Sequence, residues 1–183
     1  MRVHIDDINE NGPELTFEEK AASFPALEEI TNKNECAFLK PLSIRIQMRR
    51  IGDLFEGMGS IDTRIRLNCS RCLQPFEFTL ESKFDMTYIQ QPADMADPVF
   101  REEIELQAEE IGLIQFYGNE IDLRDAIQEE VIMALPMTTL CRSDCKGLCA
   151  RCGADLNQGN CGCDRRITNP QFEVLKNLKI DKR

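Results

Sequence analysis

The sequence lacks several features that whole classes of protein require. It has no run of about 18 apolar residues, the length needed for a membrane-spanning helix, so we expect no membrane partner. Its only histidine is His4, and it has no Gly-x-Ser-x-Gly motif, Walker loop or dinucleotide fingerprint. We therefore expect neither an enzyme nor a small-molecule substrate. Residues 1–7 contain no apolar core segment and no small-residue cleavage site, which favours a cytoplasmic protein over a secreted one.

The net charge of −10 is unevenly distributed along the chain. Residues 36–75 carry seven basic and three acidic side chains, and residues 136–183 carry nine and five. Residues 76–135, between them, carry three basic and fifteen acidic side chains. A field this negative disfavours indiscriminate binding of nucleic acid, but two basic segments that meet in space would still form a local basic face.

The pattern of apolar residues predicts an α+β fold built on a twisted antiparallel sheet. A hydrophobic content of 42% is sufficient for a core. Between residues 42 and 88, apolar and polar residues alternate with period two, which is typical of half-buried strands, and the short links between them indicate a meander. Gly57 and Gly59 indicate a bend or bulge near the start of the second strand. The three strands are predicted around residues 44–48, 61–69 and 76–88.

Shorter elements are expected on either side of this meander. We predict a short strand at residues 2–8, a helix or turn within residues 13–30, and another short strand at residues 112–117. The acidic residues 91–110 contain two prolines and are expected to form an exposed loop.

One main helix is expected to pack against the sheet. Asp122 is its predicted N-cap, and Pro136 ends it. A cysteine-rich segment follows, and Asn169-Pro170 begins a last short helix. We therefore divide the chain into an α+β domain at residues 1–136 and a zinc-stapled segment at residues 137–183 that closes over it.

Nine cysteines are many for a chain of 183 residues, and eight of them fall into closely spaced pairs. Without an export signal, such pairs are expected to bind metal rather than to form disulfides. Cys149 and Cys152 place two thiolates on one side of a tight loop, and Cys161 and Cys163 face the same way in an extended chain. These four thiolates satisfy the tetrahedral preference of zinc. Four free thiols in a polar loop are the alternative, but the segment has almost no apolar residues that would order it otherwise.

Two further pairs each supply half of a site. Cys69 and Cys72 lie at the predicted tip of a hairpin, and Cys141 and Cys145 follow the main helix. Together they would form a second site of four thiolates. The alternative is that the hairpin pair is simply buried, because free cysteine packs as a small hydrophobe, and spacing alone does not decide between the two. Zinc is favoured over an iron–sulfur cluster because the spacings match no iron–sulfur pattern.

Four stretches of the chain match a known family in their order and spacing. They are residues 69–76 (CSRCLQPF), residues 120–136, residues 145–157 and residues 169–179. Through them the sequence resembles the YceD family of large ribosomal RNA subunit accumulation proteins. The resemblance implies a role in making or retaining large-subunit ribosomal RNA in bacteria and plastids, and it implies no enzymatic activity.

The resemblance also bears on the second metal site. Some members lack the last four cysteines but keep the hairpin pair, and they have histidines near the positions of Cys141 and Cys145. Both ligand sets suit zinc, so this exchange implies that Cys69, Cys72, Cys141 and Cys145 share one ion.

Two kinds of partner are compatible with this resemblance. The first is ribosomal RNA or a large-subunit ribosomal protein or precursor. In the alternative, the protein is an adaptor that binds a basic ribosomal protein through the acidic residues 94–130 without touching RNA. The candidate RNA-binding residues are Arg64, Arg66, Arg71, Arg165 and Arg166.

Overall fold

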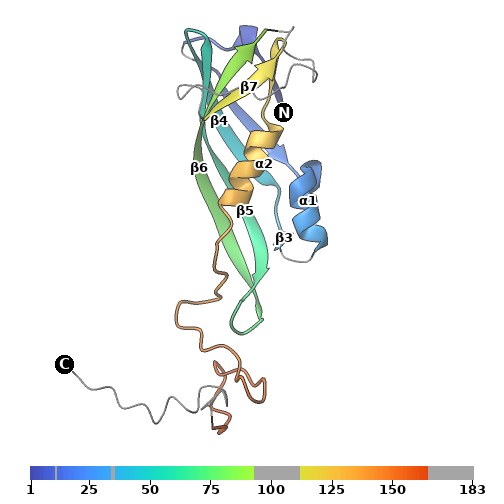
Figure 1. Ribbon diagram of the computed structural model, residues 1–183, viewed down its shortest axis with the longest axis vertical. Coiled ribbons are helices and arrows are strands. Elements are labelled where there is room, and N and C mark those ends of the chain that lie inside the picture. Colours follow the sequence, from blue (N-terminus) through green and yellow to red (C-terminus); the bar gives the residue numbers. More distant parts are fainter. Residues whose placement is uncertain (11, 34–35, 93–111, 165–183) are drawn as a thin grey trace, which may run out of the picture.

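Two long antiparallel strands, β5 (Leu54–Asn68) and β6 (Pro75–Gln91), form the spine of the molecule. The computed structural model describes residues 1–10, 12–33, 36–92 and 112–164. Figure 1 shows the β5–β6 hairpin extending well beyond the two helices, α1 (Pro25–Asn32) and α2 (Arg124–Met133). The remaining elements are β1 (Arg2–His4), β2 (Glu14–Glu19), β3 (Cys36–Phe38), β4 (Leu42–Ile51), β7 (Leu113–Tyr117), β8 (Glu120–Asp122) and two 3-10 turns at Ile5–Asp7 and Ala21–Ser23.

The main sheet has the strand order β2-β4-β5-β6-β7, and β3 pairs with the C-terminal end of β5. β1 and β8 form a separate two-stranded sheet. Strands β4, β5 and β6 pair antiparallel in chain order, which confirms the predicted meander. β7 occupies the strand predicted at residues 112–117, but it pairs parallel to β6, so the sheet is mixed rather than wholly antiparallel. A parallel pair needs a long crossover, and the chain between Gln91 and Leu113 is long enough to make one.

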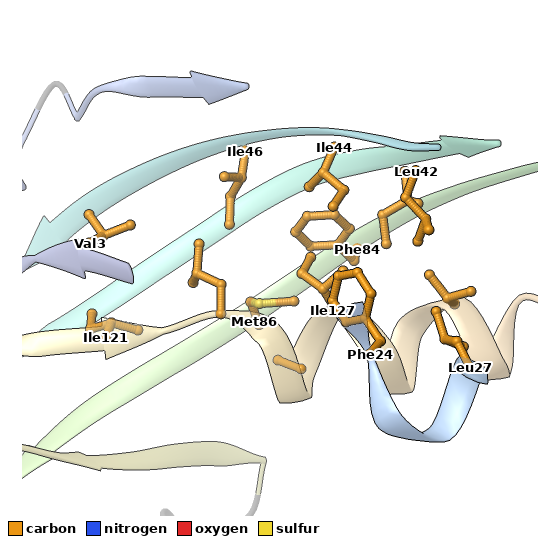
Figure 2. Close-up of a cluster of buried hydrophobic side chains, with 14 of the residues drawn as sticks. Val3, Phe24, Leu27, Leu42, Ile44, Ile46, Phe84, Met86, Ile121 and Ile127 are labelled. Atoms are coloured by element: carbon orange, nitrogen blue, oxygen red, sulfur yellow. The ribbon is translucent and has the colours of Figure 1, made fainter. Parts of the chain in front are cut away.

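One face of the sheet carries the core, and both helices contribute to it. Period-two alternation turns every second residue of β4, β5 and β6 inward, while charged residues such as Arg45, Asp62 and Glu81 occupy the opposite, exposed face. Figure 2 shows Leu27 of α1, Ile127 of α2 and Phe24, the residue before α1, in this core. The buried residues of the three strands include Leu42, Ile44, Ile46, Met48, Phe55, Ile61, Ile65, Leu67, Leu80, Phe84, Met86 and Tyr88.

The N-terminal region differs from its prediction in two places. The strand expected over residues 2–8 ends at His4 and continues as a 3-10 turn. The helix or turn expected within residues 13–30 is a strand followed by a helix. The strand forms because Leu15 and Phe17 alternate with polar residues and pack against the core. Phe17 is paired with Ile44, so β2 extends the sheet beyond β4.

The main helix begins one residue later than predicted. Leu123 is its N-cap, and Asp122 is the last residue of β8, where pairing with Arg2 of β1 holds it in extended conformation. The Asp122 carboxylate nevertheless accepts a hydrogen bond from the backbone N–H of Arg124 at 3.1 Å, so it still satisfies a donor of the first turn. The helix ends at Met133, before Pro136.

Several predictions concern residues outside the described ranges: most of the loop at 91–110, the last helix from Asn169, and Arg165 and Arg166. The division at residue 136 stays a prediction. Within the described part of the chain, none of the helices has the length and apolar character needed to cross a membrane.

Candidate metal centres

The structure brings the eight paired cysteines together as two groups of four. Cys69, Cys72, Cys141 and Cys145 form the first group, here named the hairpin cluster. Cys149, Cys152, Cys161 and Cys163 form the second group, here named the loop cluster. Within each group the sulfur atoms lie within 4.8 Å of one another. In the described residues, these are the groups of histidine, cysteine and carboxylate side chains whose spacing suits a metal ion.

The sulfur–sulfur distances in the hairpin cluster are those expected around a tetrahedral ion. The Sγ atoms of Cys69 and Cys145 lie 3.7 Å apart, and so do those of Cys72 and Cys141. Four sulfurs each about 2.3 Å from a zinc ion at tetrahedral corners are about 3.8 Å apart. A disulfide would need about 2.05 Å, and all nine cysteines are free thiols. The residues present therefore fit a metal ion with four thiolate ligands.

Each cluster contains a Cys-x-x-Cys turn with the same backbone hydrogen bonds. In the turn that begins at Cys69, the Cys69 carbonyl accepts from the N–H of Leu73 at 2.9 Å, and the Cys69 N–H donates to the carbonyl of Gln74 at 2.9 Å. In the loop cluster, Cys149 makes the equivalent bonds with Gly153 and Ala154, both at 2.8 Å. These turns aim backbone N–H groups at the first sulfur of each pair.

The backbone N–H groups favour thiolates at those two sulfurs. Hydrogen bonds from the backbone of Cys141, Cys72 and Arg71 lower the pKa of Cys69 to about 6. Hydrogen bonds from the backbone of Arg151 and Cys152 likewise lower the pKa of Cys149 to about 6.

Three further thiols have pKa values shifted in opposite directions. The side-chain amide of Asn157 lowers the pKa of Cys145. Burial raises the pKa of Cys141 to about 12, and the neighbouring thiols of Cys152 and Cys161 raise that of Cys163 to about 12. Each cluster therefore mixes thiolates with thiols that resist deprotonation beside them, and a divalent cation would relieve that repulsion.

The two clusters differ in exposure. Cys69, Cys72 and Cys145 are almost wholly buried, with 0%, 2% and 2% of their surfaces exposed. In the loop cluster only Cys149 is buried, and Cys152 is exposed. The hairpin cluster thus forms a small core of its own, packed against Phe76, Leu140 and Leu148, whereas the loop cluster lies at the surface.

Hydrogen bonds join the hairpin tip to the segment that follows α2. The N–H and hydroxyl of Ser70 both donate to the carbonyl of Thr139, at 2.7 and 3.0 Å. The carbonyl of Arg71 accepts from the N–H of Leu148 at 3.1 Å, and the Arg71 guanidinium donates to the carbonyl of Cys145 at 2.9 Å. These contacts bring together residues about seventy positions apart, and in Figure 1 the chain after α2 runs toward the hairpin tip.

The candidate RNA-binding arginines do not form a purely basic surface. Arg64 and Arg66 are exposed on the open face of β5, and both lie near the carboxylate of Glu77, at 3.8 and 3.9 Å. Glu77 belongs to the acidic part of the sequence, which the hairpin therefore places beside the basic part. Arg71, expected to point to solvent, is engaged by the Cys145 carbonyl.

Sequence reasoning identified the cysteines but missed two residues that support them. Arg71 was predicted as a candidate RNA-binding residue, and Asn157 was not predicted to contact a cysteine. No signal in a single sequence reveals that Arg71 reaches a carbonyl 74 positions away. The only sequence feature that points to a role for Asn157 is its position as a polar amide within a cysteine-rich loop. His4 lies in β1 and accepts a weak hydrogen bond at 3.4 Å from the N–H of Asp6, in keeping with a structural role.

Comparison with known proteins agrees with the resemblance noted in the sequence. A family model described as large ribosomal RNA subunit accumulation protein YceD matches residues 58–179. The chain is 26% identical over 156 residues to the Arabidopsis thaliana chloroplastic protein named large ribosomal RNA subunit accumulation protein YCED homolog 1, covering 76% of this chain and 49% of that protein. The Zea mays protein of the same name is 23% identical over 145 residues, covering 69% and 50%.

A bacterial relative is similar over a shorter range. An uncharacterized protein of Mycobacterium tuberculosis is 30% identical over 110 residues, covering 58% of this chain and 49% of that protein. The chain spans about half the length of the curated relatives it matches. No solved structure matches it.

Proposed function

The chain belongs to the YceD family of large ribosomal RNA subunit accumulation proteins, and from this membership we propose that it supports accumulation of large-subunit ribosomal RNA and assembly of the large ribosomal subunit. The observation that carries the proposal is the match over residues 58–179, which includes the hairpin, α2 and both cysteine clusters. We propose a non-enzymatic factor, acting in the cytoplasm, with no small-molecule substrate.

Deletion of the gene tests this role. The expected result is a lower level of large-subunit ribosomal RNA relative to small-subunit RNA, restored by the intact gene. An unchanged ratio in the deletion strain would contradict the proposed function.

We also propose that each cluster holds one structural zinc ion. Closed sets of four thiolates leave no open coordination position, which is the arrangement of structural rather than catalytic zinc. On this view residues 137–183 form a zinc-stapled segment, and the ion in the hairpin cluster fixes that segment to the tip of an α+β domain at residues 1–136.

Metal analysis of protein purified without added metal tests the zinc proposal. The expected ratio is about two zinc ions per chain, one for each four-thiolate site. A ratio near one would mean that only one of the two clusters binds zinc. A brown protein with visible absorbance would indicate an iron–sulfur cluster instead.

The partner is proposed to be ribosomal RNA or a large-subunit ribosomal protein or precursor. Arg64 and Arg66 are exposed and available for phosphate contacts, although Glu77 lies between them. Arg71, Arg165 and Arg166 complete the candidate set.

A second candidate function is a protein–protein adaptor that binds a basic ribosomal protein without RNA contact. The placement of Glu77 beside Arg64 and Arg66 favours it, because the carboxylate offsets charge that would otherwise attract phosphate. Binding to naked large-subunit RNA at increasing salt separates the two candidates. Strong binding that weakens steeply with salt supports direct RNA contact, and no binding at low salt supports the adaptor.

A further inference from the structure

Asn157 is carried by the loop cluster, but its side chain contacts the hairpin cluster. It lies between Cys152 and Cys161, the two inner ligands of the loop cluster. Its Nδ2 group nevertheless lies 3.4 Å from the Sγ atom of Cys145 and donates a hydrogen bond to it. A residue on the loop between two ligands of one four-cysteine site thus contacts a ligand of the other.

The remaining hydrogen bonds of Asn157 fix the direction of its amide. Its Oδ1 atom accepts from the N–H of Lys146 at 2.8 Å and from the guanidinium of Arg142 at 2.8 Å. Its Nδ2 also donates to the carboxylate of Asp155 at 2.8 Å. With Oδ1 committed to two donors, the amide has one orientation, and in that orientation an N–H faces the Cys145 sulfur.

The position of Asn157 also depends on the path of the loop that carries it. Between Cys152 and Cys161 the chain is mostly exposed, and Leu156 is its one buried residue within the described structure. The loop is tied back by the hydrogen bond from Leu156 N–H to the Gly147 carbonyl at 2.9 Å and by the bridge between Leu148 and Asp155. Four ligands on one ion at the ends of this mostly exposed loop would order it further.

A hydrogen bond to a ligand sulfur stabilises the thiolate that binds metal. Groups of this kind around a metal site typically change metal affinity by about ten- to a hundredfold when they are removed. Asn157 is thus expected to raise the affinity of the hairpin cluster only when the loop is closed.

We propose that Asn157 couples the two clusters, so that metal bound at the loop cluster increases the metal affinity of the hairpin cluster through the Asn157 amide on Cys145. The inference rests on the proposed zinc binding and deepens it. Because linkage is reciprocal, metal at the hairpin cluster also raises the affinity of the loop cluster by the same factor. The exposed site thereby governs how firmly the hairpin tip is fastened.

Zinc affinities of full-length variants, measured by competition with a chelator, test the coupling. Cys152→Ser leaves the hairpin cluster intact, and Cys72→Ser leaves the loop cluster intact. The product of the two stepwise binding constants of the wild-type chain is compared with the product of the constants of the two variants. We expect the wild-type product to be larger by about ten- to a hundredfold. The same comparison in an Asn157→Ala background should give a ratio near one.

Two more variants separate the contact to sulfur from a general loosening of the loop. Asn157→Asp keeps an acceptor for Lys146 and Arg142 but has no N–H for Cys145. We expect it to lose the coupling and to shift the thiolate-to-metal charge-transfer band of the cobalt-loaded hairpin cluster. Gln158→Ala removes an exposed neighbour whose side chain donates to the carboxylate of Asp155 at 3.2 Å and not to a cysteine, and it should leave both the coupling and the band unchanged.

The outcomes are distinguishable. A wild-type product equal to the product of the single-cluster variants overturns the coupling while leaving both metal sites in place. A coupling that survives Asn157→Ala and Asn157→Asp overturns the role of Asn157. If the wild-type chain binds neither zinc nor cobalt, the proposed metal centres fail and the inference fails with them.

Discussion

At the scale of single residues, Leu73 has the most unusual backbone in the described structure. Its φ of +61° lies in the left-handed region that favours glycine. It follows Cys72 in the hairpin turn, as Gly153 follows Cys152 in the loop turn, where φ is +73°. The Leu73 side chain is 64% exposed, so packing gains little from it. The two turns therefore adopt the same conformation with different residues at the strained position.

Leu73→Gly should consequently stabilise the zinc-loaded protein. Relief of the left-handed strain, less the extra flexibility of glycine in the unfolded chain, predicts a gain of about 0.5–1 kcal/mol. Gly153→Leu is the matched reciprocal change and should lose about 1 kcal/mol. Urea unfolding of both variants at saturating zinc checks the prediction. A loss of stability in Leu73→Gly would mean that the Leu73 side chain makes a contact that its exposure does not reveal.

Asp122 links the start of α2 to the N-terminal strand and makes stability depend on pH. Its carboxylate accepts hydrogen bonds from Arg124 side-chain and backbone groups and from the Arg2 side chain at 3.3 Å, and these contacts hold its pKa well below the usual range. A carboxyl with a depressed folded pKa contributes stability above its unfolded pKa of about 3.9, and that contribution is lost as pH falls through the folded value.

Asp122→Asn should therefore cost stability at pH 7 and cost less at pH 3, where the pH lies between the unfolded and folded pKa values and part of the contribution has been lost. The side chain is about one-third exposed, so we expect a loss of only about 1 kcal/mol at pH 7. Urea unfolding of the wild-type chain and the variant at both pH values gives the comparison. Any metal released at low pH is released from both proteins, so it does not affect the difference between them. Asp85→Asn, on the open face of β6, controls for removal of one carboxylate. A gap between wild type and Asp122→Asn that widens toward pH 3 would contradict the argument.

At the scale of elements, Gly59 allows three strands to pack closely. A Cβ atom at this position would lie 2.2 Å from the carbonyl oxygen of Arg45 in β4 and 2.5 Å from the ring of Phe84 in β6. Phe84 is buried, with 6% of its surface exposed, so its ring crosses β5 where no side chain stands. The glycine predicted to mark a bend thus makes room for an aromatic ring within a continuous strand.

Gly59→Ala should destabilise the protein by about 1–3 kcal/mol, because the added methyl group overpacks the core and meets backbone that cannot move aside. Thermal unfolding at fixed zinc concentration measures the loss. Gly159→Ala is the control, since a Cβ there meets nothing within 4 Å. Equal stability of Gly59→Ala and wild type would show that β4 and β6 can shift to accommodate the methyl group.

The sequence predicted those elements whose periodicity is strong and local. The alternation in β4, β5 and β6 and the heptad-like spacing of α2 are direct consequences of one buried face, so both were found. The strand β2 was missed because residues 13–30 mix glutamates with Phe and Leu, a composition that also suits a helix. The parallel pairing of β7 was missed because a strand's direction depends on its partner and not on its own residues.

The grouping of the cysteines could likewise be predicted where the ligands are close in sequence and not where they are distant. The loop cluster was predictable because its four ligands lie within fifteen residues. For the hairpin cluster, spacing left the question open, and the structure adds the observation that Cys69 and Cys72 lie beside Cys141 and Cys145. The contacts of Arg71 and Asn157 depend on where the backbone goes, and residue type alone does not encode them.

At the scale of the whole molecule, the proposed zinc binding would change the charge of the protein. Two zinc ions would bring four positive charges and eight thiolates eight negative ones, so full loading would take the formal net charge from −10, with all thiols protonated, to −14. Loaded metal centres would thus make the molecule more acidic, and any contact with phosphate would have to come from a local surface.

Loading should release protons in proportion to the number of thiols that become thiolates. Cys69 and Cys149, whose pKa values are about 6, are already mostly ionised at pH 7. We therefore expect about six protons released per chain on binding two zinc ions. Calorimetry in buffers of different ionisation enthalpy counts them. Release of about three protons would indicate that only one cluster binds.

The separation between the two halves of the hairpin cluster sets an order of events during synthesis. Cys69 and Cys145 are 76 positions apart, and Cys72 and Cys141 are 69 apart. A chain made from its N-terminus presents the hairpin tip long before the second half of this site has been translated. The loop cluster closes a far shorter stretch, which costs less chain entropy, so on the proposed zinc binding it would capture its ion as soon as Cys163 emerges. Fastening of the hairpin tip across the long stretch is then a late step, completed only after α2 has been translated and the chain has returned to the tip.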